Sequence, residues 1–154
     1  MKKLEEFLAF ENFKERVELI YDTELAEDYI PDVNDVSPHA FNRYKGDFNS
    51  GGVPAKLSEV QETIFKCDNL ITNYCLNRKS NSNINCGIQL YDKDKSSIVV
   101  AGYIYNFNKS NCTYRFYIMT GRKFLHNYKW GFKNSDELII NNDNTKRKIE
   151  INKP

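Results

Sequence analysis

Long hydrophobic runs are absent from this 154-residue sequence. No uninterrupted apolar stretch approaches the roughly eighteen residues that a membrane-spanning helix needs. The opening stretch MKKLEEFLAFENF has the lysines of an export signal, but Glu5, Glu6 and Glu11 interrupt its apolar residues. We therefore expect a protein of the cytoplasm that has no membrane partner.

Glycine and proline are also scarce, at seven and four residues, which argues against a scaffold made mainly of loops. Hydrophobic residues make up 40% of the chain, and ten tyrosines and ten phenylalanines supply large side chains for a core. A chain of this length fits one domain that buries roughly two-thirds of its unfolded surface. The sequence predicts a single globular domain over residues 1–154.

The residues of most catalytic and metal sites are missing as well. The four cysteines form no CxxC pair, and the two histidines, His39 and His126, stand at no ligand spacing from them. There is no glycine-rich phosphate loop, no HExxH and no nucleophile elbow. We expect buried thiols, no metal, no cofactor and no catalytic residues.

Charge is unevenly distributed, although the net charge is only +1. Residues 1–36 hold four basic and eleven acidic groups, a balance of −7, whereas residues 109–154 hold ten basic and four acidic groups, a balance of +6. Opposite-signed surfaces of this kind can steer partners, although an acidic helix face beside a basic sheet edge would give the same pattern. In the acidic third, Asp28, Asp32 and Asp35 are candidate partner-binding residues.

Apolar spacing predicts helices in the first half of the chain. Steps of three and four residues run from Leu4 to Tyr21, with a possible break near Asn12. A proline at the second position predicts a short helix over 37–46. The clearest pattern covers Ser58 to Arg78, where Ser58 and Gln61 resemble a capping box.

After residue 84 the period changes to two, which indicates strands. The expected strands cover residues 84–90, 99–107, 112–119, 124–132, 137–141 and 146–152. Helices followed by strands predict an α+β fold, in which the helical part, about 2–78, packs on one face of an antiparallel meander of about five or six strands, about 84–152.

A tight turn near Asn108–Asn111 fixes the register of the aromatic hairpin. The expected pairs are Tyr105 with Tyr114 and Tyr103 with Phe116, which would place these four rings on the face under the helices. A loop of three residues would exchange the two faces of one strand, because side chains alternate.

The opposite face of that hairpin would then carry a patch of Ile104, Arg115, Tyr117 and Met119. Tyrosine and arginine are favoured at protein interfaces, so these residues are candidate partner contacts. Alternatively, the long segment between the helices covers this face.

We therefore expect a small cytoplasmic protein-binding module of the inhibitor, immunity or antitoxin type, which would bind a partner protein such as a basic toxin or enzyme. The alternative is a nucleic-acid binder or ribonuclease on the basic aromatic sheet, which would use phosphate-binding and base-stacking side chains. Its candidate residues are Arg122, Lys123, His126, Lys129, Trp130 and Lys133. A small-molecule cavity between helices and sheet is a third possibility.

Overall fold

The computed structural model describes residues 2–21, 52–125, 127–142 and 149–151. These residues form an α+β fold, as predicted. The elements in chain order are α1 (Lys2–Arg16), β1 (Val17–Tyr21), β2 (Val53–Pro54), α3 (Leu57–Asn77), β3 (Ile84–Tyr91), β4 (Ser97–Asn108), β5 (Thr113–Phe124), β6 (Leu138–Asn142) and β7 (Ile149–Ile151).

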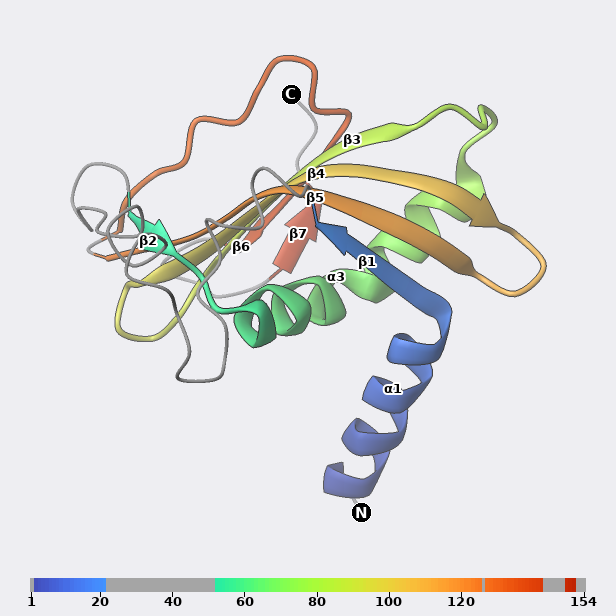
Figure 1. Cartoon of the computed structure of the whole chain (residues 1–154), viewed down its shortest axis with the longest axis horizontal. Helices are drawn as coiled ribbons and strands as arrows, with labels where there is room; N and C mark the ends of the chain where they lie inside the picture. Colours follow the sequence, from blue (N-terminus) through green and yellow to red (C-terminus); the bar gives the residue numbers. More distant parts are fainter. Residues whose placement is uncertain (1, 22–51, 126, 143–148, 152–154) are drawn as a thin grey trace.

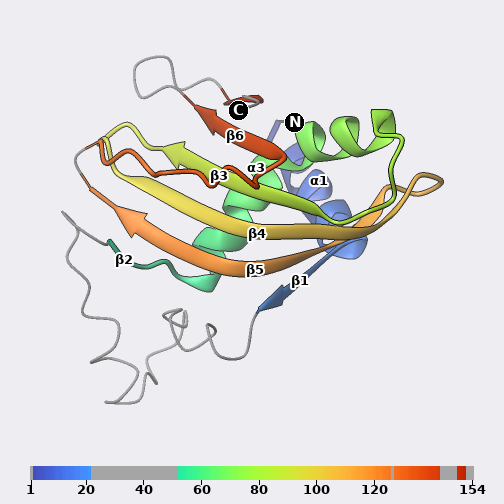
Figure 2. The same cartoon turned by 90° about the horizontal axis from the view of Figure 1, so that it is seen from above.

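The described strands form one mixed sheet in the order β1-β5-β4-β3-β6-β7, and the short β2 pairs antiparallel with β5 off this path (Figure 2). Strands β3, β4 and β5 are an antiparallel meander, but β1 runs parallel to β5 and β6 runs parallel to β3. The expected all-antiparallel meander is therefore wrong. Both exceptions join strands that lie far apart in the sequence, and local turn patterns carry no information on such pairs.

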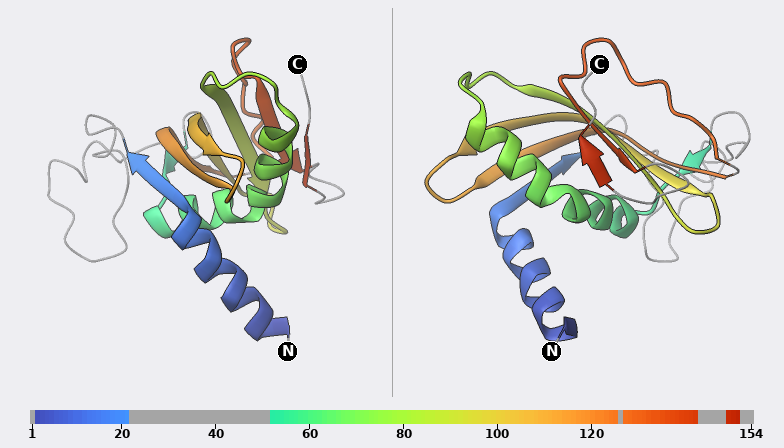
Figure 3. Two further views of the ribbon diagram at one scale, coloured as in Figure 1. Left: turned by 90° about the vertical axis from the view of Figure 1, so that its right-hand side faces the viewer. Right: turned by 180° about the vertical axis from the view of Figure 1, so that it is seen from behind.

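Helix α3 covers one face of the sheet and forms the core with it (Figure 3). It matches the helix predicted over 58–78, although Glu59 provides the cap by accepting the backbone N–H of Lys56 at 3.0 Å. Its buried stripe contacts the sheet through apolar side chains that are fully enclosed, including Ile64, Cys67 and Ile71. The face of the sheet toward α3 is called the inner face below.

The predicted first helix is wrong beyond Arg16, because Val17–Tyr21 is the strand β1. The apolar residues of VELIY continue the three- and four-residue spacing of the helix. Valine, isoleucine and tyrosine nevertheless favour strands, and pairing with β5 makes this segment a strand. The helix also shows no break at Asn12, whose side chain accepts a hydrogen bond from Arg16 Nε at 2.6 Å.

The predicted hairpin of β4 and β5 is present, but its register is shifted by one position over Gly102–Tyr105 and by two positions beyond the bulges on either side. Ile104 pairs with Phe116 and Tyr103 pairs with Tyr117, and β-bulges follow Ala101 and Tyr105. Tyr114 and Phe116 lie on the inner face as expected. Tyr103 and Tyr105 lie instead on the other face, called the outer face below.

Residue 125 and residues 127–137 form an irregular segment rather than the strand predicted over 124–132. This segment lies on the side of the sheet opposite to α3 (Figure 1, orange to red). Gln89 of β3 holds it through hydrogen bonds to the carbonyl of Tyr128 at 2.7 Å and from the backbone N–H of Trp130 at 3.1 Å. The alternating aromatic residues of the segment thus cover part of the outer face.

The last predicted hairpin is confirmed, since β6 and β7 pair antiparallel. The short helix predicted over 37–46 lies outside the described residues. Within the described part of the chain, no helix is long and apolar enough to cross a membrane.

Candidate functional site

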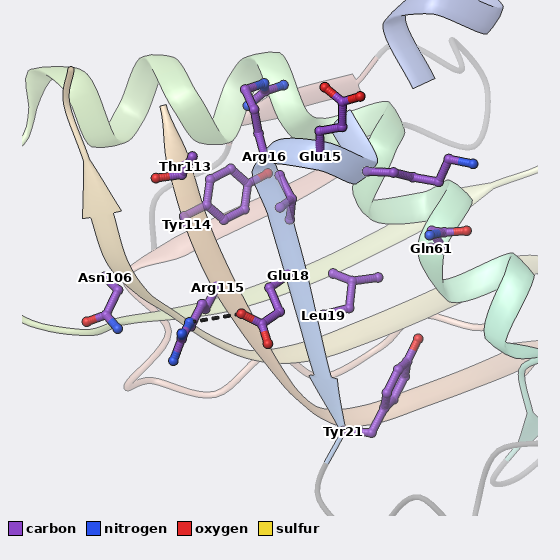
Figure 4. A pocket seen from close by; sticks show the side chains of 12 residues that line it. Glu15, Arg16, Glu18, Leu19, Tyr21, Gln61, Asn106, Thr113, Tyr114 and Arg115 are labelled. Carbon is purple, nitrogen blue, oxygen red and sulfur yellow. Dashed lines mark ion pairs between the residues drawn. The ribbon is translucent and has the colours of Figure 1, made fainter. Parts of the chain in front are cut away.

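A groove with a volume of about 670 Å³ runs beside β1 (Figure 4). Side chains from α1, β1, α3 and the β4–β5 hairpin line it. We call it the β1 groove, and its lining residues are Lys14, Glu15, Arg16, Val17, Glu18, Leu19, Tyr21, Gln61, Asn106, Thr113, Tyr114 and Arg115.

An aromatic cluster fixes the end of α1 that borders the groove. The ring of Phe65 on α3 lies 5.0 Å from the ring of Phe10 and 5.3 Å from that of Phe13, measured between centroids. Phe13 is almost fully buried. The C-terminal half of α1 is therefore packed against α3, and the chain enters β1 in a defined direction.

A polar network at the junction of α1 and β1 holds the same end in place. The Asp68 carboxylate accepts hydrogen bonds from the Tyr114 hydroxyl at 2.8 Å and from Arg16 at 2.5 Å. Arg16 also donates to the carbonyl of Cys112 at 2.9 Å. Burial raises the pKa of Tyr114 well above its ordinary value, and the neighbouring Asp68 raises it further. Tyr114 is therefore a neutral donor at physiological pH.

The cations around the groove already have carboxylate partners. Arg115 contacts Glu18 at 3.0 Å, and Lys14 contacts Glu11 at 2.8 Å. With Arg16 bound to Asp68, the groove presents little uncompensated positive charge. Such a lining suits an occupant of low net charge better than a phosphate or another strong anion.

No protein family, curated protein or solved structure matches this chain. The functional assignment therefore rests on the geometry of the described residues.

Helix α1 projects away from the rest of the described chain, with its N-terminus at the tip (Figures 1 and 3). Residues 3–9 are all exposed, and the side chains of Leu4, Phe7 and Leu8 are 57%, 58% and 56% accessible. These three residues are called the α1 stripe below. Phe7 and Leu8 stand three and four positions after Leu4, so the three lie on one side of the helix.

The α1 stripe lies in line with the β1 groove. Steps of three and four residues lead from Leu4 through Leu8 and Glu11 to Lys14 and Glu15, and the last two line the groove. The stripe and the groove therefore form one continuous surface, apolar toward the tip of α1 and polar along β1.

The sequence-predicted partner patch is only partly present. Arg115, Tyr117 and Met119 belong to the outer-face side of β5, where the Tyr117 ring stacks on that of Tyr103 at 4.9 Å. Met119 is 39% exposed. Ile104 is fully buried on the inner face, so its placement in an exposed patch is wrong; the one-residue shift in register turned it toward α3. Asp28, Asp32 and Asp35 lie outside the described residues.

The residues proposed for nucleic acid are only partly together: Trp130 and Lys133 line one outer-face pocket, but Lys123 lies on the inner face. Lys123 contacts Glu59 of α3 at 3.3 Å, whereas its neighbour Arg122 points to the other face and reaches the carbonyl of Gly52 at 3.4 Å. Lys129 and Lys133 are exposed, and Trp130 is half-buried against Phe124. His126 lies outside the described residues.

All four cysteines are free thiols in the structure. Burial raises the pKa of Cys67 to about 12 and that of Cys75 to about 11, and it raises the pKa of Cys86 well above the ordinary value. Thiols of this kind are poor nucleophiles, because the thiolate is the reactive form. Among the described residues, no group of histidine, cysteine and carboxylate side chains could hold a metal ion.

Sequence reasoning missed both the β1 groove and the α1 stripe, because it assigned all apolar residues of the first helix to one buried face. The sequence did contain a pattern that indicates an exposed side of the first helix. Phe10 and Phe13 lie on one side of the helix, and Leu4, Phe7 and Leu8 lie on a different side. A single helix resting on one layer can bury only one of these sides.

Proposed function

We propose that this chain is a small protein-binding module, of the inhibitor or immunity type, which contacts its partner through the α1 stripe and the β1 groove. The observation that carries the proposal is the exposure of three large apolar side chains on a helix that projects from the domain. Apolar residues grouped at one surface are typical of protein interaction sites.

The helix itself supports a docking role. Isolated helices shorter than about 12–15 residues are marginal in water, and residues 3–9 of α1 include no buried side chain to stabilise this part of the helix. A partner that covers Leu4, Phe7 and Leu8 would supply this packing. At roughly 1.5–3 kcal/mol for each fully buried side chain, reduced because they start half-covered, the gain would be on the order of 2–5 kcal/mol.

The outer face offers a second partner contact. Tyr117, stacked on Tyr103, and the exposed Met119 lie on β5, whose residue Arg115 also lines the β1 groove. Tyrosine, methionine and arginine are enriched at interfaces. A partner that extends from the groove across β5 would contact them as well. We also propose that the protein acts in the cytoplasm. Its buried cysteines are free thiols, which is typical of proteins in a reducing compartment.

Capture of the partner tests the proposal. Immobilised protein is incubated with lysate of the source organism, and the wild type is compared with the double variant Phe7→Ser, Leu8→Ser. We expect one stoichiometric protein that the double variant retains at least ten-fold less well. The matched control is Leu76→Ser, which removes an exposed leucine, 41% accessible, from α3. Equal retention by the double variant, or no captured protein, would refute the proposal.

Nucleic-acid binding is the second candidate, and the observation that favours it is the Tyr103–Tyr117 stack on a face that also carries Lys133. Binding of a single-stranded homopolymer would weaken steeply with salt and fall on charge reversal of Lys133. The proposed protein complex should instead persist at high salt. No homopolymer binding at low salt would eliminate this candidate.

A further inference from the structure

A small pocket lies on the outer face, between the irregular segment 127–137 and the strands below it. We call it the Trp130 pocket. It has a volume of about 80 Å³, and its lining residues are Asn85, Ala101, Gly102, Met119, Thr120, Trp130, Lys133, Ser135 and Asp136. Sites that enclose a whole small molecule measure roughly 300–1,000 Å³. The Trp130 pocket therefore suits the end of one side chain rather than a complete nucleotide.

The carboxylate of Asp136 lines this pocket and has no cationic partner. Asp136 is only 6% exposed. Its Oδ2 atom accepts the backbone N–H of Lys133 at 2.9 Å, and no other described residue donates to the carboxylate. The next residue, Glu137, contacts Arg78 at 2.6 Å, whereas Asp136 forms no ion pair with a described residue. Because a buried charge without a partner is costly, a cation that enters the pocket would be favoured.

Strand β3 holds both Asp136 and Trp130 in place. The Oδ2 atom of Asp136 lies against Gly87, where a Cβ atom would be 3.1 Å away. The backbone N–H of Trp130 donates to the side chain of Gln89 at 3.1 Å, and the indole ring lies 5.8 Å from the ring of Phe124. Both groups are positioned before any ligand binds, which reduces the entropic cost of binding.

The chemistry of the lining selects a guanidinium group. Among aromatic side chains, tryptophan attracts cations most strongly. Asn85, Thr120 and Ser135 add oxygen atoms that accept hydrogen bonds beside the charge of Asp136. A guanidinium group carries five N–H donors in one plane and is more weakly hydrated than an ammonium group. It therefore suits several acceptors beside an indole better than the end of a lysine does.

A phosphate or another anion suits this pocket poorly. Lys133 belongs to the lining, but it is exposed and forms no ion pair with a described residue. Its backbone N–H, which donates to Asp136, is part of the pocket whatever the position of its ammonium group. An anion inside the pocket would face the buried carboxylate, and like charges at short distance repel.

We infer that the Trp130 pocket binds the side chain of an arginine of the partner protein. The origin of this arginine rests on the proposed protein-binding function. Met119, which is 39% exposed and belongs to the second partner contact on β5, also lines the pocket. A partner that covers Met119 therefore reaches the pocket, and arginine is one of the residues that contribute most at protein interfaces.

The intrinsic fluorescence of the intact chain tests the pocket directly, because Trp130 is its only tryptophan. The wild type is titrated with N-acetylarginine amide, N-acetyllysine amide and the neutral N-acetylcitrulline amide. We expect a saturable change in emission with the arginine compound, and about ten-fold weaker binding of the other two. Equal binding of the arginine and citrulline compounds, or no response, would overturn the inference. So would a response to free L-arginine alone, since the source would then be the amino acid.

Two variants of opposite charge distinguish a cation from an anion. Asp136→Asn keeps an oxygen that accepts the N–H of Lys133, and should weaken binding of the arginine compound about ten-fold. Lys133→Gln should leave this binding unchanged or strengthen it. The matched control is Glu62→Gln, which removes the same unit of charge from the exposed surface of α3. Inorganic phosphate that binds the wild type, and binds Lys133→Gln more weakly, would overturn the inference.

Circular dichroism and the thermal midpoint show whether these variants are folded. The comparison of the three amides uses the wild type, so it tests the pocket even where a variant fails to fold.

Capture from lysate separates this inference from the proposed function. The captured partner should be retained about ten-fold less well by Asp136→Asn and should be displaced by N-acetylarginine amide. A partner that depends on Phe7 and Leu8 but not on Asp136 would refute the inference and leave the proposed function intact. Binding of the arginine compound without any captured protein would refute the proposed function, and with it the origin of the arginine.

Discussion

The Tyr114 hydroxyl donates to the Asp68 carboxylate at 2.8 Å, and so joins the inner face of β5 to α3 in the interior of the protein. The other carboxylate oxygen of Asp68 receives Arg16, the last residue of α1. A single buried carboxylate thus ties both helices to the sheet, beside the strand that borders the groove.

We predict that Tyr114→Phe lowers the free energy of unfolding by about 1–3 kcal/mol, because it leaves a buried carboxylate oxygen without its donor. Urea unfolding measures the change. The control is Glu62→Gln, which removes only the exposed ion pair with Lys66 and should cost less than about 0.5 kcal/mol. Equal losses of unfolding free energy in the two variants would show that the hydrogen bond from Tyr114 to Asp68 stabilises the fold no more than an exposed ion pair does.

Alkaline pH should destabilise the protein. Burial raises the pKa of Cys67 to about 12 and holds that of Tyr114 well above its ordinary value, so both stay protonated in the folded state. Above pH 9 for the thiol and pH 10 for the phenol, the unfolded chain loses these protons first. The free energy of unfolding therefore falls as pH rises, by up to about 1.4 kcal/mol per pH unit for each group.

Urea titrations between pH 8 and pH 11 check this prediction. The contribution of Tyr114 is isolated with Tyr114→Phe, whose stability should decline less steeply between pH 10 and pH 11 than that of the wild type. Parallel slopes for the two proteins would contradict the buried, neutral state of this tyrosine.

Thiol labelling should separate Cys112 from the other three cysteines. Cys112 is partly exposed in the β4–β5 turn, whereas Cys67, Cys75 and Cys86 are buried. With Ellman's reagent at pH 8, we expect one fast thiol in the native protein and four after unfolding. Cys112→Ser should remove the fast phase alone; a fast phase that survives this substitution would place the reactive thiol elsewhere.

Two glycines provide a matched pair for backbone packing. A Cβ atom at Gly102 would lie 1.9 Å from the carbonyl oxygen of Tyr117, a backbone atom that cannot move aside, whereas at Gly131 it would meet nothing within 4 Å. We predict that Gly102→Ala lowers the free energy of unfolding by about 3 kcal/mol, and that Gly131→Ala changes it by less than about 0.5 kcal/mol. Thermal or urea unfolding of both variants measures the two changes, and equal stabilities of the two variants would contradict the prediction.

Local patterns in the sequence predicted the elements whose partners are close in the chain. Helix α3 and the β4–β5 hairpin follow from apolar spacing and a short polar turn, and both are present. The hairpin register was missed because the connecting loop covers residues 109–112 rather than 108–111, and because the bulge after Tyr105, where Asn106 has a positive φ, shifts the pairing again.

Non-local contacts could not be predicted in this way. Residues 17–21 fit a helical spacing and become a strand only because β5 accepts them in parallel. Residues 124–132 alternate like a strand, but Gln89 binds the backbone of Tyr128 and Trp130 and holds them above the sheet. The β1 groove depends on these long-range pairings, so sequence spacing could not bring its lining residues together. The exposed α1 stripe, in contrast, could have been recognised on a helical projection, because Leu4, Phe7 and Leu8 lie on a different side of the helix from Phe10 and Phe13.

The parallel pairing of β1 with β5 also determines when the site can exist during synthesis. Val17 pairs with Tyr114, which the ribosome adds almost a hundred residues later. At a rate of about 5–20 residues per second, β1 leaves the ribosome roughly 5–20 s before its neighbour in the sheet is available. Throughout that interval residues 17–21 have no neighbouring strand to pair with, so β1 cannot form before β5 has been synthesised.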